Sequence, residues 1–496
     1  MAIPGHQSVC GRVYRLSVTG TLITTLLAGT ALAQSTAPVD LSKWSPDYVK
    51  SIAGTQKYDT AADCGKVVPN DYKGRVTYWY QGPTEAEPQI THDMDKAFWD
   101  AFKAAYPNIE ADAQSIHYNE MLDKFRTALL GNAVPMVIRL QILGGVEFAA
   151  KGYLQPLGPE DVGYTTADFW PGALKSVTWE GETYGIPTNN ETMGFIWNAK
   201  IFEEAGLDPE NPPATWDDVV AYSKQIKDKL GISGYGLVAK QNAGNTPFRF
   251  MPMLWAYGGG ALDEARDNPS YKTVELNSAE SKQALQAAHD MYVRDKSAPT
   301  SALTNTQAEN QAPFIAGQLA MMIAHPAEYS KMLDLAGKAT GADKEVADEV
   351  VANMRYGLIP EGPGRRAVVF GGSNIHMVKP EYVEGEFDEQ AAKALICMWT
   401  SPEWSTKLSW VTSNPGHLGG FKTEWMKQRL EETKFLDVTT SMLPSGVPFP
   451  VIPEAPEIMN IIVPDMMQNA LTGTMTVDEA AAHAAAEVEK LVGGGL

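Results

Sequence analysis

Hydrophobic and polar positions along residues 73–140 switch between the period of a strand and that of a helix. Arg75–Tyr80 is a short run rich in aromatic and β-branched residues, which predicts a buried strand. Four apolar residues between 98 and 105 recur at helical spacing, and Pro107 ends this predicted helix. The pattern further predicts strands over 109–115 and 136–140 and a helix over 118–130. This β-α-β-α-β order indicates a mostly parallel sheet with helices on both faces.

The same alternation recurs in the second half of the chain. It predicts helices over 217–230 and 278–294 and strands over 235–239 and 319–324. The charged, Ala-rich stretch 331–348 predicts a solvated helix or loop. Thr476 and Glu479 have the spacing of a capping box, which opens an Ala-rich helix to about Val492. With 496 residues, 44% of them hydrophobic, the chain can bury two cores, because single cores stop growing near about 250–300 residues.

Residues 184–218 join several elements in one run. A segment punctuated by Gly and Pro enters a short apolar strand, and the short helix that follows ends at Gly206, a residue suited to a left-handed cap. Two prolines come next. Thr215 can then cap a new helix while Asp218 reaches back to it. The run predicts strand, helix, turn and helix in that order.

The order and spacing of this run resembles the family 1 extracellular solute-binding proteins of bacterial ABC importers. The resemblance extends over about residues 73–492 and includes the turn Gly131–Pro135, the strand Gly317–Met321, the segment Gly371–Asn374 and the helix start Ser401-Pro402-Glu403. The sequence departs from the family at two positions. Met136 stands where an aspartate is usual, and Ala327 stands where maltose-binding relatives carry a tryptophan that stacks on sugar.

The resemblance implies an α/β, two-lobe periplasmic binding protein fold (type II-like) whose lobes are joined by hinge crossovers. The crossovers are expected near 188–192, 371–377 and 411–418. Ligand would lie between the lobes, beside the strand ends. The expected division is a signal peptide (1–33), an extension over the surface (34–72), lobe 1 (73–190 plus 376–412) and lobe 2 (191–372 plus 418–496).

The N-terminus has the pattern of an export signal. Arg12 and Arg15 precede the apolar stretch Leu16–Ala28, which is shorter than the about 20 residues of a membrane span. Ala31-Leu32-Ala33 is a small-x-small cleavage site. We therefore expect a periplasmic protein cleaved after Ala33. It is not expected to be a lipoprotein, because no cysteine follows that site.

The net charge limits the classes of binding partner, and the cysteine content limits the possible disulfides. The formal net charge is −20, and removal of the signal peptide makes it −22, so phosphate backbones and anionic lipid surfaces are poor partners. We expect no nucleic-acid partner and a monomer. Cys64 and Cys397 remain in the mature chain. They either pair in an oxidising compartment or leave Cys397 as a buried thiol.

A sugar ligand needs aromatic faces against its C–H groups and amides, carboxylates or guanidinium groups on its hydroxyls. Trp79, Tyr80 and Gln81 end the first predicted strand, where alternation sends one aromatic ring to the core and the other to the cleft. Asn189 to Glu191 lie at the first predicted crossing. The resemblance matches Glu191 to a sugar-contacting acid, whereas three polar residues in a row otherwise form a turn.

Each of the other candidate residues has both a ligand-binding and a structural interpretation. Trp255 with its glycines resembles a cleft loop of the family, but the ring also suits a core. Gly371–Asn374 offers backbone N–H groups at a crossing, or forms a plain tight turn. Arg139, Arg249 and His417 are suited to an anionic group, or have structural roles. The predicted ligand-binding set is Trp79, Tyr80, Gln81, Arg139, Gln141, Asn189, Asn190, Glu191, Trp255, Gly258, Gly259, His325, Gly371, Gly372, Ser373, Asn374 and His417.

The function that the resemblance implies is capture of a carbohydrate and its delivery to ABC permease subunits in the inner membrane. It implies no enzymatic activity, no cofactor and no metal. The alternatives are a secreted glycoside hydrolase and a binding protein that signals to a chemoreceptor. A hydrolase needs two carboxylates about 5–10 Å apart across a cleft. With 60 acidic residues such pairs must occur, so their presence decides nothing.

Overall fold

The computed structural model describes residues 38–83, 87–241, 244–409, 414–433 and 435–493. The predicted signal peptide and its cleavage site lie outside the described residues, as does part of the crossing predicted at 411–418. None of the helices in the described ranges is both long and apolar enough to cross a membrane.

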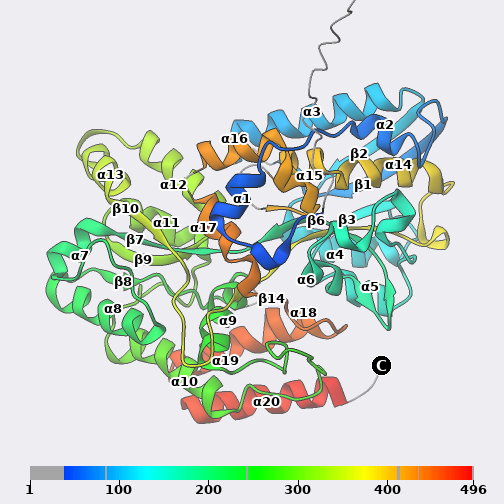
Figure 1. The fold of residues 1–496 in the computed structure, drawn as a ribbon. Helices are drawn as coiled ribbons and strands as arrows, with labels where there is room; N and C mark the ends of the chain where they lie inside the picture. Colours follow the sequence, from blue (N-terminus) through cyan, green and yellow to red (C-terminus); the bar gives the residue numbers. More distant parts are fainter. Residues whose placement is uncertain (1–37, 84–86, 242–243, 410–413, 434, 494–496) are drawn as a thin grey trace, which may run out of the picture. The chain divides into compact units, whose positions relative to one another are not determined.

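A six-stranded sheet organises the first lobe. Its strand order is β13-β6-β12-β3-β1-β2, with β1 parallel to β2 and β3, and with β12 antiparallel to β3 and β6. Figure 1 labels β6, β3, β1 and β2 of this sheet. The β-α-β-α-β order predicted from the sequence is confirmed, but the prediction of a mostly parallel sheet is wrong, because β12, β6 and β13 join the sheet through antiparallel pairs. The strands are β1 (Gly74–Tyr80), β2 (Ile109–Ser115), β3 (Val137–Gln141), β6 (Ile186–Glu191), β12 (Gly371–Met377) and β13 (Asn414–Pro415), and the connecting helices are α3 (Gln89–Ala105) and α4 (Tyr118–Leu129).

Side chains of β1 alternate between the two faces of this sheet. Tyr78 and Tyr80 are buried against Trp399 of α14 (Glu389–Thr400), with ring centroids 5.1 and 5.3 Å away. Trp79 points to the opposite face, where Lys124 of α4 lies 4.5 Å from its ring centroid. The core of the first lobe is therefore aromatic, and Tyr80 is the ring that alternation sends into it.

A four-stranded sheet of order β10-β7-β9-β8 organises the second lobe. The helix after β7 ends at Gly206, whose φ of +76° is left-handed, and Thr215 and Asp218 form the capping box of α8, so both predictions are confirmed. Thr476 and Glu479 likewise cap α20. These elements are β7 (Gly194–Asn198), α7 (Ala199–Ala205), α8 (Trp216–Leu230), β8 (Ser233–Tyr235), α10 (Ala279–His289, continued by a π-helical turn over Asp290–Arg294), β9 (Leu319–Ala324), β10 (Met354–Gly357) and α20 (Val477–Gly493).

Two predicted strands have different bounds. The strand predicted over 235–239 is wrong: β8 ends at Tyr235, and residues 236–239 are buried without belonging to a strand, because Asn310 donates to the Gly236 carbonyl and Ala239 donates to that of Ala302. The strand predicted over 136–140 begins and ends one residue later. The stretch 331–348 falls within α12 (Pro326–Lys338) and α13 (Gly341–Asn353).

The remaining elements complete both lobes. They are α5 (Gly145–Ala150), α6 (Pro171–Lys175), α9 (Asn245–Tyr257), α11 (Gln307–Ile315), α15 (Pro402–Leu408), α16 (Glu424–Glu432), α17 (Leu436–Ser441), α18 (Ala455–Glu457), α19 (Val463–Leu471) and the short strands β4 (Thr178–Trp179), β5 (Glu182–Thr183), β11 (Val368–Val369) and β14 (Gly446–Val447).

The segments predicted to cross between the lobes meet side by side in the first sheet. Ser373 of β12 pairs with Asn189 of β6, and Asn414 of β13 pairs with Asn190 on the other edge of β6. The strand β6 ends at Glu191 and β7 of the second sheet begins at Gly194, so two residues separate the sheets there. Adjacent strands thus lead from one lobe to the other.

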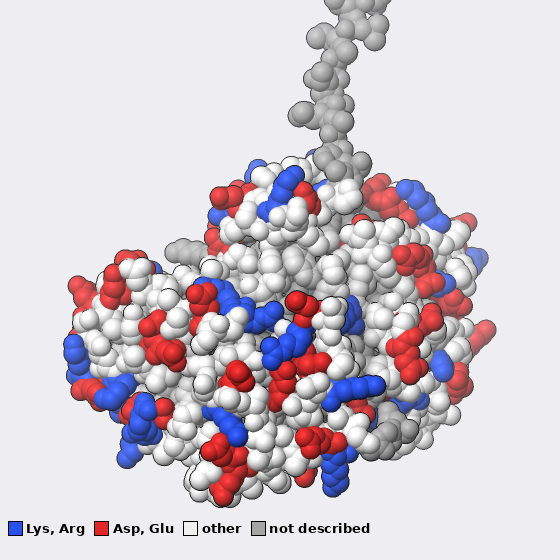
Figure 2. Space-filling view, turned by 60° about the horizontal axis from the view of Figure 1, so that its bottom comes forward, with Lys and Arg blue, Asp and Glu red and all other residues white. Residues whose placement is uncertain are grey.

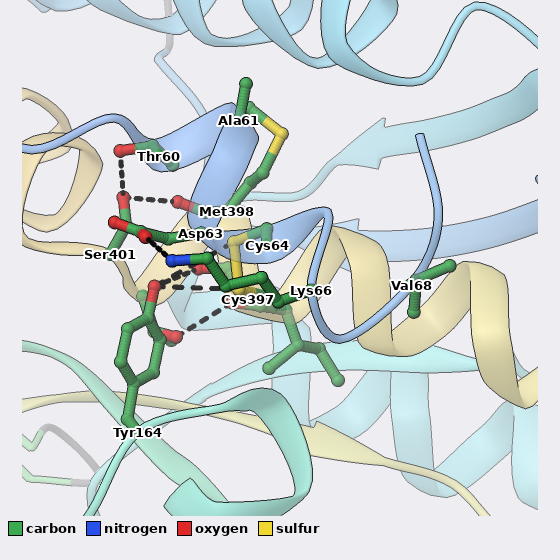
Figure 3. The surroundings of a disulfide bond; sticks show 12 residues. Thr60, Ala61, Asp63, Cys64, Lys66, Val68, Tyr164, Cys397, Met398 and Ser401 are labelled. Carbon is green, nitrogen blue, oxygen red and sulfur yellow. Dashed lines mark hydrogen bonds and ion pairs between the residues drawn. A yellow bond between two sulfur atoms is a disulfide. The ribbon is translucent and has the colours of Figure 1, made fainter. Parts of the chain in front are cut away.

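Residues 40–68, here called the N-terminal strap, pack against both lobes. Trp44 makes edge contacts with Trp170 and Phe421, and its indole N–H donates to the Thr440 carbonyl at 3.0 Å. The strap contains α1 (Pro46–Ile52) and α2 (Thr60–Cys64). Cys64 at the end of α2 forms a disulfide with Cys397 of α14, which decides between the two alternatives that the sequence left open (Figure 3).

Charged side chains of both signs are interspersed on the surface. On the face that Figure 2 shows, acidic and basic residues alternate over short distances. Many of the ion pairs are of the exposed i,i+4 kind, such as Lys96–Asp100 and Lys224–Asp228. Such pairs contribute little to stability, about 0.3–0.5 kcal/mol each.

Candidate functional site

Polar side chains from two strands of the first sheet meet where the chain crosses between lobes. Arg139 of β3 donates from Nε to the Thr188 hydroxyl at 2.9 Å and from Nη2 to Asn189 Oδ1 at 2.7 Å. Asn189 in turn donates from Nδ2 to Glu191 Oε1 at 3.1 Å. The three residues form one network through both groups of the Asn189 amide. Because Asn189 to Glu191 belong to β6, the interpretation of this triplet as a turn is wrong.

Burial and charge act against each other in this network. Burial raises the pKa of Glu191, while the Arg139 guanidinium, the Asn189 amide and the Arg249 guanidinium act to lower it. Burial also lowers the pKa of Arg139, and the Tyr78 and Glu191 side chains oppose that shift. The half-buried guanidinium and carboxylate, bridged by one amide, offset each other's charge, since an isolated buried charge is costly.

Glycines let the facing strand approach this network closely. A Cβ atom on Gly371 would lie 3.0 Å from Phe248 Cε1 and 3.4 Å from Glu191 Cβ. Gly372 has a φ of +132°, and a Cβ atom there would lie 2.2 Å from the Asn189 carbonyl oxygen. Neither position accommodates a side chain without a shift of its neighbours. Of the two interpretations of Gly371–Asn374, the plain tight turn is wrong, because these residues lie within β12.

Two helices of the second lobe bring charged groups to the same place. Arg249 of α9 forms a buried ion pair with Glu328, which lies in the first turn of α12. His325 is the N-cap of α12, and its Nδ1 lies 3.3 Å from the Thr192 carbonyl oxygen just after β6. Burial lowers the pKa of His325 to about 3, so the ring is neutral and Nδ1 donates to that carbonyl. Phe248, half-buried, lies between Gly371 and the Phe449 ring, whose centroid is 5.0 Å away.

Other predicted residues around the crossing have mainly backbone-packing roles. The Asn190 amide is fully buried and donates to the Pro415 carbonyl at 3.0 Å. Asn374 donates to the Ser176 hydroxyl at 3.2 Å. Ser373 accepts through its carbonyl from Thr188, and Gln141 is its partner across the β12–β3 pair. Asn190 thus ties β6 to β13, Asn374 ties β12 to the residue after α6, and Ser373 pairs with both β3 and β6.

The aromatic residues at the end of β1 do not join this network. Tyr80 is a core residue, and its hydroxyl receives the Trp99 indole N–H at 3.2 Å. Trp79 lines a separate hollow of about 490 Å³ on the other face of the sheet, together with Lys124, Asp123 and other residues of α4. Gln81 is exposed beyond the strand end. Alternation along β1 places these side chains on opposite faces.

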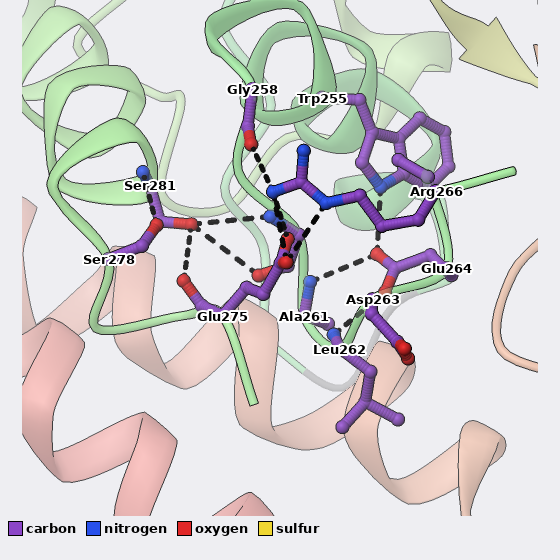
Figure 4. A network of polar contacts seen from close by, with 12 residues as sticks. Trp255, Gly258, Ala261, Leu262, Asp263, Glu264, Arg266, Glu275, Ser278 and Ser281 are labelled. Atoms are coloured by element: carbon purple, nitrogen blue, oxygen red, sulfur yellow. Dashed lines mark hydrogen bonds and ion pairs between the residues drawn. The ribbon is translucent and has the colours of Figure 1, made fainter. Parts of the chain in front are cut away.

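The Trp255 loop is part of the second-lobe core. Trp255 is fully buried and donates from Nε1 to Glu264 Oε1 at 2.7 Å, as Figure 4 shows. The Glu264 carboxylate also accepts from two backbone N–H groups, and the Gly258 carbonyl accepts from Arg266. Gly258 is the left-handed C-cap of α9, and a Cβ atom on Gly259 would lie 2.2 Å from Ser281 Oγ. Of the two interpretations of Trp255, the core is correct.

His417 lies apart from the network as well. Its ring packs edge-on against Tyr164 at 4.8 Å and against Phe169 at 5.1 Å, and Nδ1 accepts from the Gly419 backbone N–H at 2.9 Å. Burial lowers its pKa to about 4, and Asp168 opposes that shift. A neutral, stacked imidazole whose Nδ1 is already an acceptor is suited to packing.

Sequence reasoning missed four residues of the site: Thr188, Phe248, Arg249 as a partner of a carboxylate, and Glu328. Arg249 lies within an apolar stretch, Phe248–Tyr257, where a lone arginine has to be paired or exposed. That is a usable signal for a buried charge, but its partner lies 79 residues away in the chain. Within the described ranges, no group of three or more His, Cys, Asp or Glu residues is placed to hold a metal ion.

Comparison with known proteins gives a family and a fold. A family model described as "Bacterial extracellular solute-binding protein" matches residues 87–405. A Brucella abortus (strain 2308) chain named as a binding protein is 25% identical over 402 residues, covering 79% of this chain and 88% of its own. Maltose-bound MalE3 of T. maritima superposes with a TM-score of 0.68 at 23% identity, covering 84% of this chain and all of its own. UgpB of Mycobacterium tuberculosis in complex with glycerophosphocholine superposes with a TM-score of 0.67 at 18% identity, covering 85% and 99% of the two chains.

Proposed function

Because this chain belongs to the bacterial extracellular solute-binding protein family, we propose that it captures a carbohydrate between its lobes and delivers it to an ABC permease. The ligand would be a sugar or sugar derivative. The crossover strands β6, β12 and β13 would serve as the hinge. Ligand would favour the closed arrangement of the lobes over the open one by the difference between its affinities for these two arrangements. No covalent step is required of any residue.

The observation that carries the proposal is the network of Arg139, Asn189 and Glu191 at the crossing. A guanidinium from β3 and an amide and a carboxylate from β6 offer both donors and acceptors, which is what a hydroxyl-rich ligand needs. Phe248 supplies an aromatic ring beside Gly371. The maltose-bound neighbour on this fold supports a sugar as the ligand class.

The proposal also covers the lobe boundaries, the cellular location and the partners of the protein. We take lobe 1 as residues 73–190 plus 376–412 and lobe 2 as 191–372 plus 418–496. The mature chain would be a periplasmic monomer that begins at Gln34 after signal cleavage. Its partners would be the permease subunits of the inner membrane. Mass spectrometry of the exported protein and light scattering after gel filtration test the cleavage site and the monomer.

The decisive test is calorimetric titration of refolded, ligand-free protein. The panel comprises neutral sugars, sugar acids, sulfosugars and polyol phosphates. We expect one-to-one binding of at least one sugar or sugar derivative. Chemical turnover of a panel member without stoichiometric binding would overturn the receptor proposal.

Arg139→Gln tests whether the network touches the ligand. The variant keeps a donor but removes the charge and the second hydrogen bond, so we expect affinity to fall at least ten-fold, as for loss of about 1.4 kcal/mol. Arg75→Gln is the matched control, because Arg75 lies on β1 in an exposed pair with Asp112. Equal affinities in the two variants would remove the network from the proposed site.

A further inference from the structure

A buried ion pair in the second lobe has one unused polar atom on each partner. The side chains of Arg249 and Glu328 are 4% and 5% exposed, and they are bonded through Arg249 Nη2 and Glu328 Oε1. Arg249 Nε and Glu328 Oε2 are buried as well, and neither has a hydrogen-bond partner. Each is thus a polar group removed from water without replacement, which typically costs about 1–3 kcal/mol.

The pair lies beside the network of the proposed site. Arg249 is close enough to Glu191 to stabilise its carboxylate. The neighbouring residue Phe248 approaches the backbone of β12 at Gly371. Glu328 is three residues after His325, which contacts the chain at Thr192 between the two sheets. The unused atoms of the pair therefore belong to the part of the second lobe that adjoins β6 and β12.

The two unpaired atoms have opposite hydrogen-bonding roles. Arg249 Nε carries an N–H that can only donate, and Glu328 Oε2 is a carboxylate oxygen that can only accept when ionised. A hydroxyl group can accept from the first and donate to the second. A phosphate or carboxylate satisfies the arginine alone and is repelled by Glu328, while an ammonium group is repelled by Arg249.

Charge balance leads to the same ligand class. Arg139 is linked to Glu191 through Asn189, and Arg249 is paired with Glu328. Lys331, one turn after Glu328 on α12, pairs with Glu87 at 3.3 Å. Each of these cations already faces a carboxylate. An anionic ligand would therefore bring charge to Arg139, Arg249 and Lys331, which among the described residues of the site are already matched by carboxylates.

We propose that Arg249 and Glu328 form a hydroxyl-recognising subsite that selects an uncharged sugar or polyol over its phosphorylated or carboxylated analogue. This inference rests on the proposed function and adds the charge of the ligand. The fold alone leaves that charge open, since neighbours on it are solved with maltose and with glycerophosphocholine.

Selectivity of the unaltered protein is the first test, and it depends on no variant. Titrations compare matched probes: glucose with glucose 6-phosphate and gluconate, maltose with maltobionate, and glycerol with glycerol 3-phosphate. We expect the neutral member of the bound pair to bind at least 100-fold more tightly than its anionic partner. Tighter binding of an anionic member would overturn the inference and leave the proposed capture of a sugar derivative standing. Failure of every probe to bind would overturn both.

Glu328→Gln is the second test. The carboxamide keeps the size of the side chain and removes its charge, so Arg249 gains an unbalanced positive charge. We expect the neutral ligand to bind at least ten-fold more weakly and the preference over its anionic analogue to fall at least ten-fold. Glu210→Gln is the matched control, because Glu210 pairs with Arg355 at the surface, where its side chain is 65% exposed.

Thermal unfolding separates a binding effect from a folding effect. A Glu328→Gln protein that unfolds cooperatively and keeps the unaltered selectivity would overturn the inference. If the variant does not fold, Arg249→Lys replaces it. Lysine keeps the charge next to Glu328 but has no atom equivalent to Nε–H, and we expect a loss of neutral-ligand affinity with the preference for neutral ligands retained. Unchanged affinity in that variant would also count against the subsite.

Discussion

At the scale of single residues, packing at the crossing between lobes depends on side chains that fit in only one ionisation state and on glycines that fit in only one backbone conformation. His376 of β12 is fully buried, and its Nδ1 lies 2.7 Å from the Tyr184 carbonyl oxygen. Cβ atoms on Gly145 and Gly185 would each lie within 2.6 Å of its ring, so the imidazole fills the space that two glycines leave. The other ring nitrogen, Nε2, is buried and has no hydrogen-bond partner among the described residues.

We predict that His376 makes the protein sensitive to mild acid. Burial lowers its pKa from 6.5 to about 4. The unfolded chain therefore binds a proton at a pH where the folded chain does not, so stability is full above about pH 6.5 and is lost as the pH falls towards 4. The loss amounts to about 3.5 kcal/mol at most, because one pKa unit corresponds to about 1.4 kcal/mol.

Urea unfolding of His376→Gln at pH 7 and pH 4.5 checks this. We expect a smaller loss of stability between the two pH values than in the unaltered protein. Part of the loss should remain, because burial lowers the pKa of His325 and His417 too. His483→Gln, at an exposed position, is the control and should leave the pH dependence unchanged. Equal behaviour of the two variants would exclude His376 as a source of the acid sensitivity.

Gly372→Ala is predicted to destabilise the protein by about 2–4 kcal/mol, from a backbone that disfavours L side chains and a clash that has to be relieved. The clash is with the Asn189 carbonyl oxygen, 2.2 Å from the added Cβ. Gly473→Ala is the matched control, with a φ of +74° and nothing within 4 Å, and should cost about 1 kcal/mol. Denaturant midpoints of the two variants measure the difference. Equal losses would show that the contact is relieved without cost.

At the scale of elements, local signals were sufficient where the backbone itself determines the structure. The Thr215 hydroxyl accepts from the Asp218 N–H at 3.1 Å, and the Asp218 carboxylate accepts from the Thr215 N–H at 2.9 Å. Both residues are close in sequence, so the capping box could be predicted without knowledge of the tertiary structure. The strand predicted over 235–239 failed because an apolar run shows burial and does not show which backbone it pairs with.

Removal of this cap is expected to cost about 1 kcal/mol. Thr215→Ala leaves the first turn of α8 without its side-chain acceptor. Thr340→Ala is the comparison, since Thr340 is the N-cap of α13 and its side chain makes no capping bond. Chemical denaturation of both variants should show a loss in the first and almost none in the second. A loss of the same size at Thr340 would contradict the assignment of the energy to the capping bond.

The candidate site shows what pattern alone provides. Arg139, Asn189 and Glu191 could be proposed because they end strands or lie at a crossing, and the structure links them directly. Arg249 and Glu328 are a buried pair formed across 79 residues, and no periodicity relates such positions. Tyr80 and Trp255 have the composition of sugar-binding residues, yet burial assigns both rings to cores. Side-chain direction at a strand end therefore limits the sequence-based prediction most.

At the scale of the whole molecule, the N-terminal strap ties regions that are distant in sequence. Val49 of α1 belongs to the large core of the second lobe, whereas Cys64 and Val68 belong to the core of the first. Lys50 lies 3.7 Å from Asp437 of α17, and the Gly54 N–H donates to the Thr423 carbonyl. The strap thus contacts the segment 418–441 before it reaches the disulfide. It therefore restrains the segment that follows the third predicted crossing.

Loss of the disulfide is predicted to lower the free energy of unfolding by roughly 2–5 kcal/mol, because it closes a loop of 333 residues in the unfolded chain. A Cys64→Ser, Cys397→Ser double variant should unfold at lower temperature than the oxidised protein. Dithiothreitol added after unfolding should bring the unaltered protein close to the variant. If the variant and the oxidised protein unfold at the same temperature, the bridge contributes no net stability.

The burial of Cys64 and Cys397, 0% and 1% exposed, also has a consequence for the timing of biosynthesis. Cys64 emerges from the ribosome and through the export channel long before its partner, which follows 333 residues later. Once α14 has docked, neither sulfur is open to an oxidase or a reductant. We therefore expect oxidation to be fastest in the interval between arrival of Cys397 and final docking of that helix. A disulfide formed in this interval is made late in folding. Its presence in a purified sample would then indicate that the chain was oxidised before folding was complete.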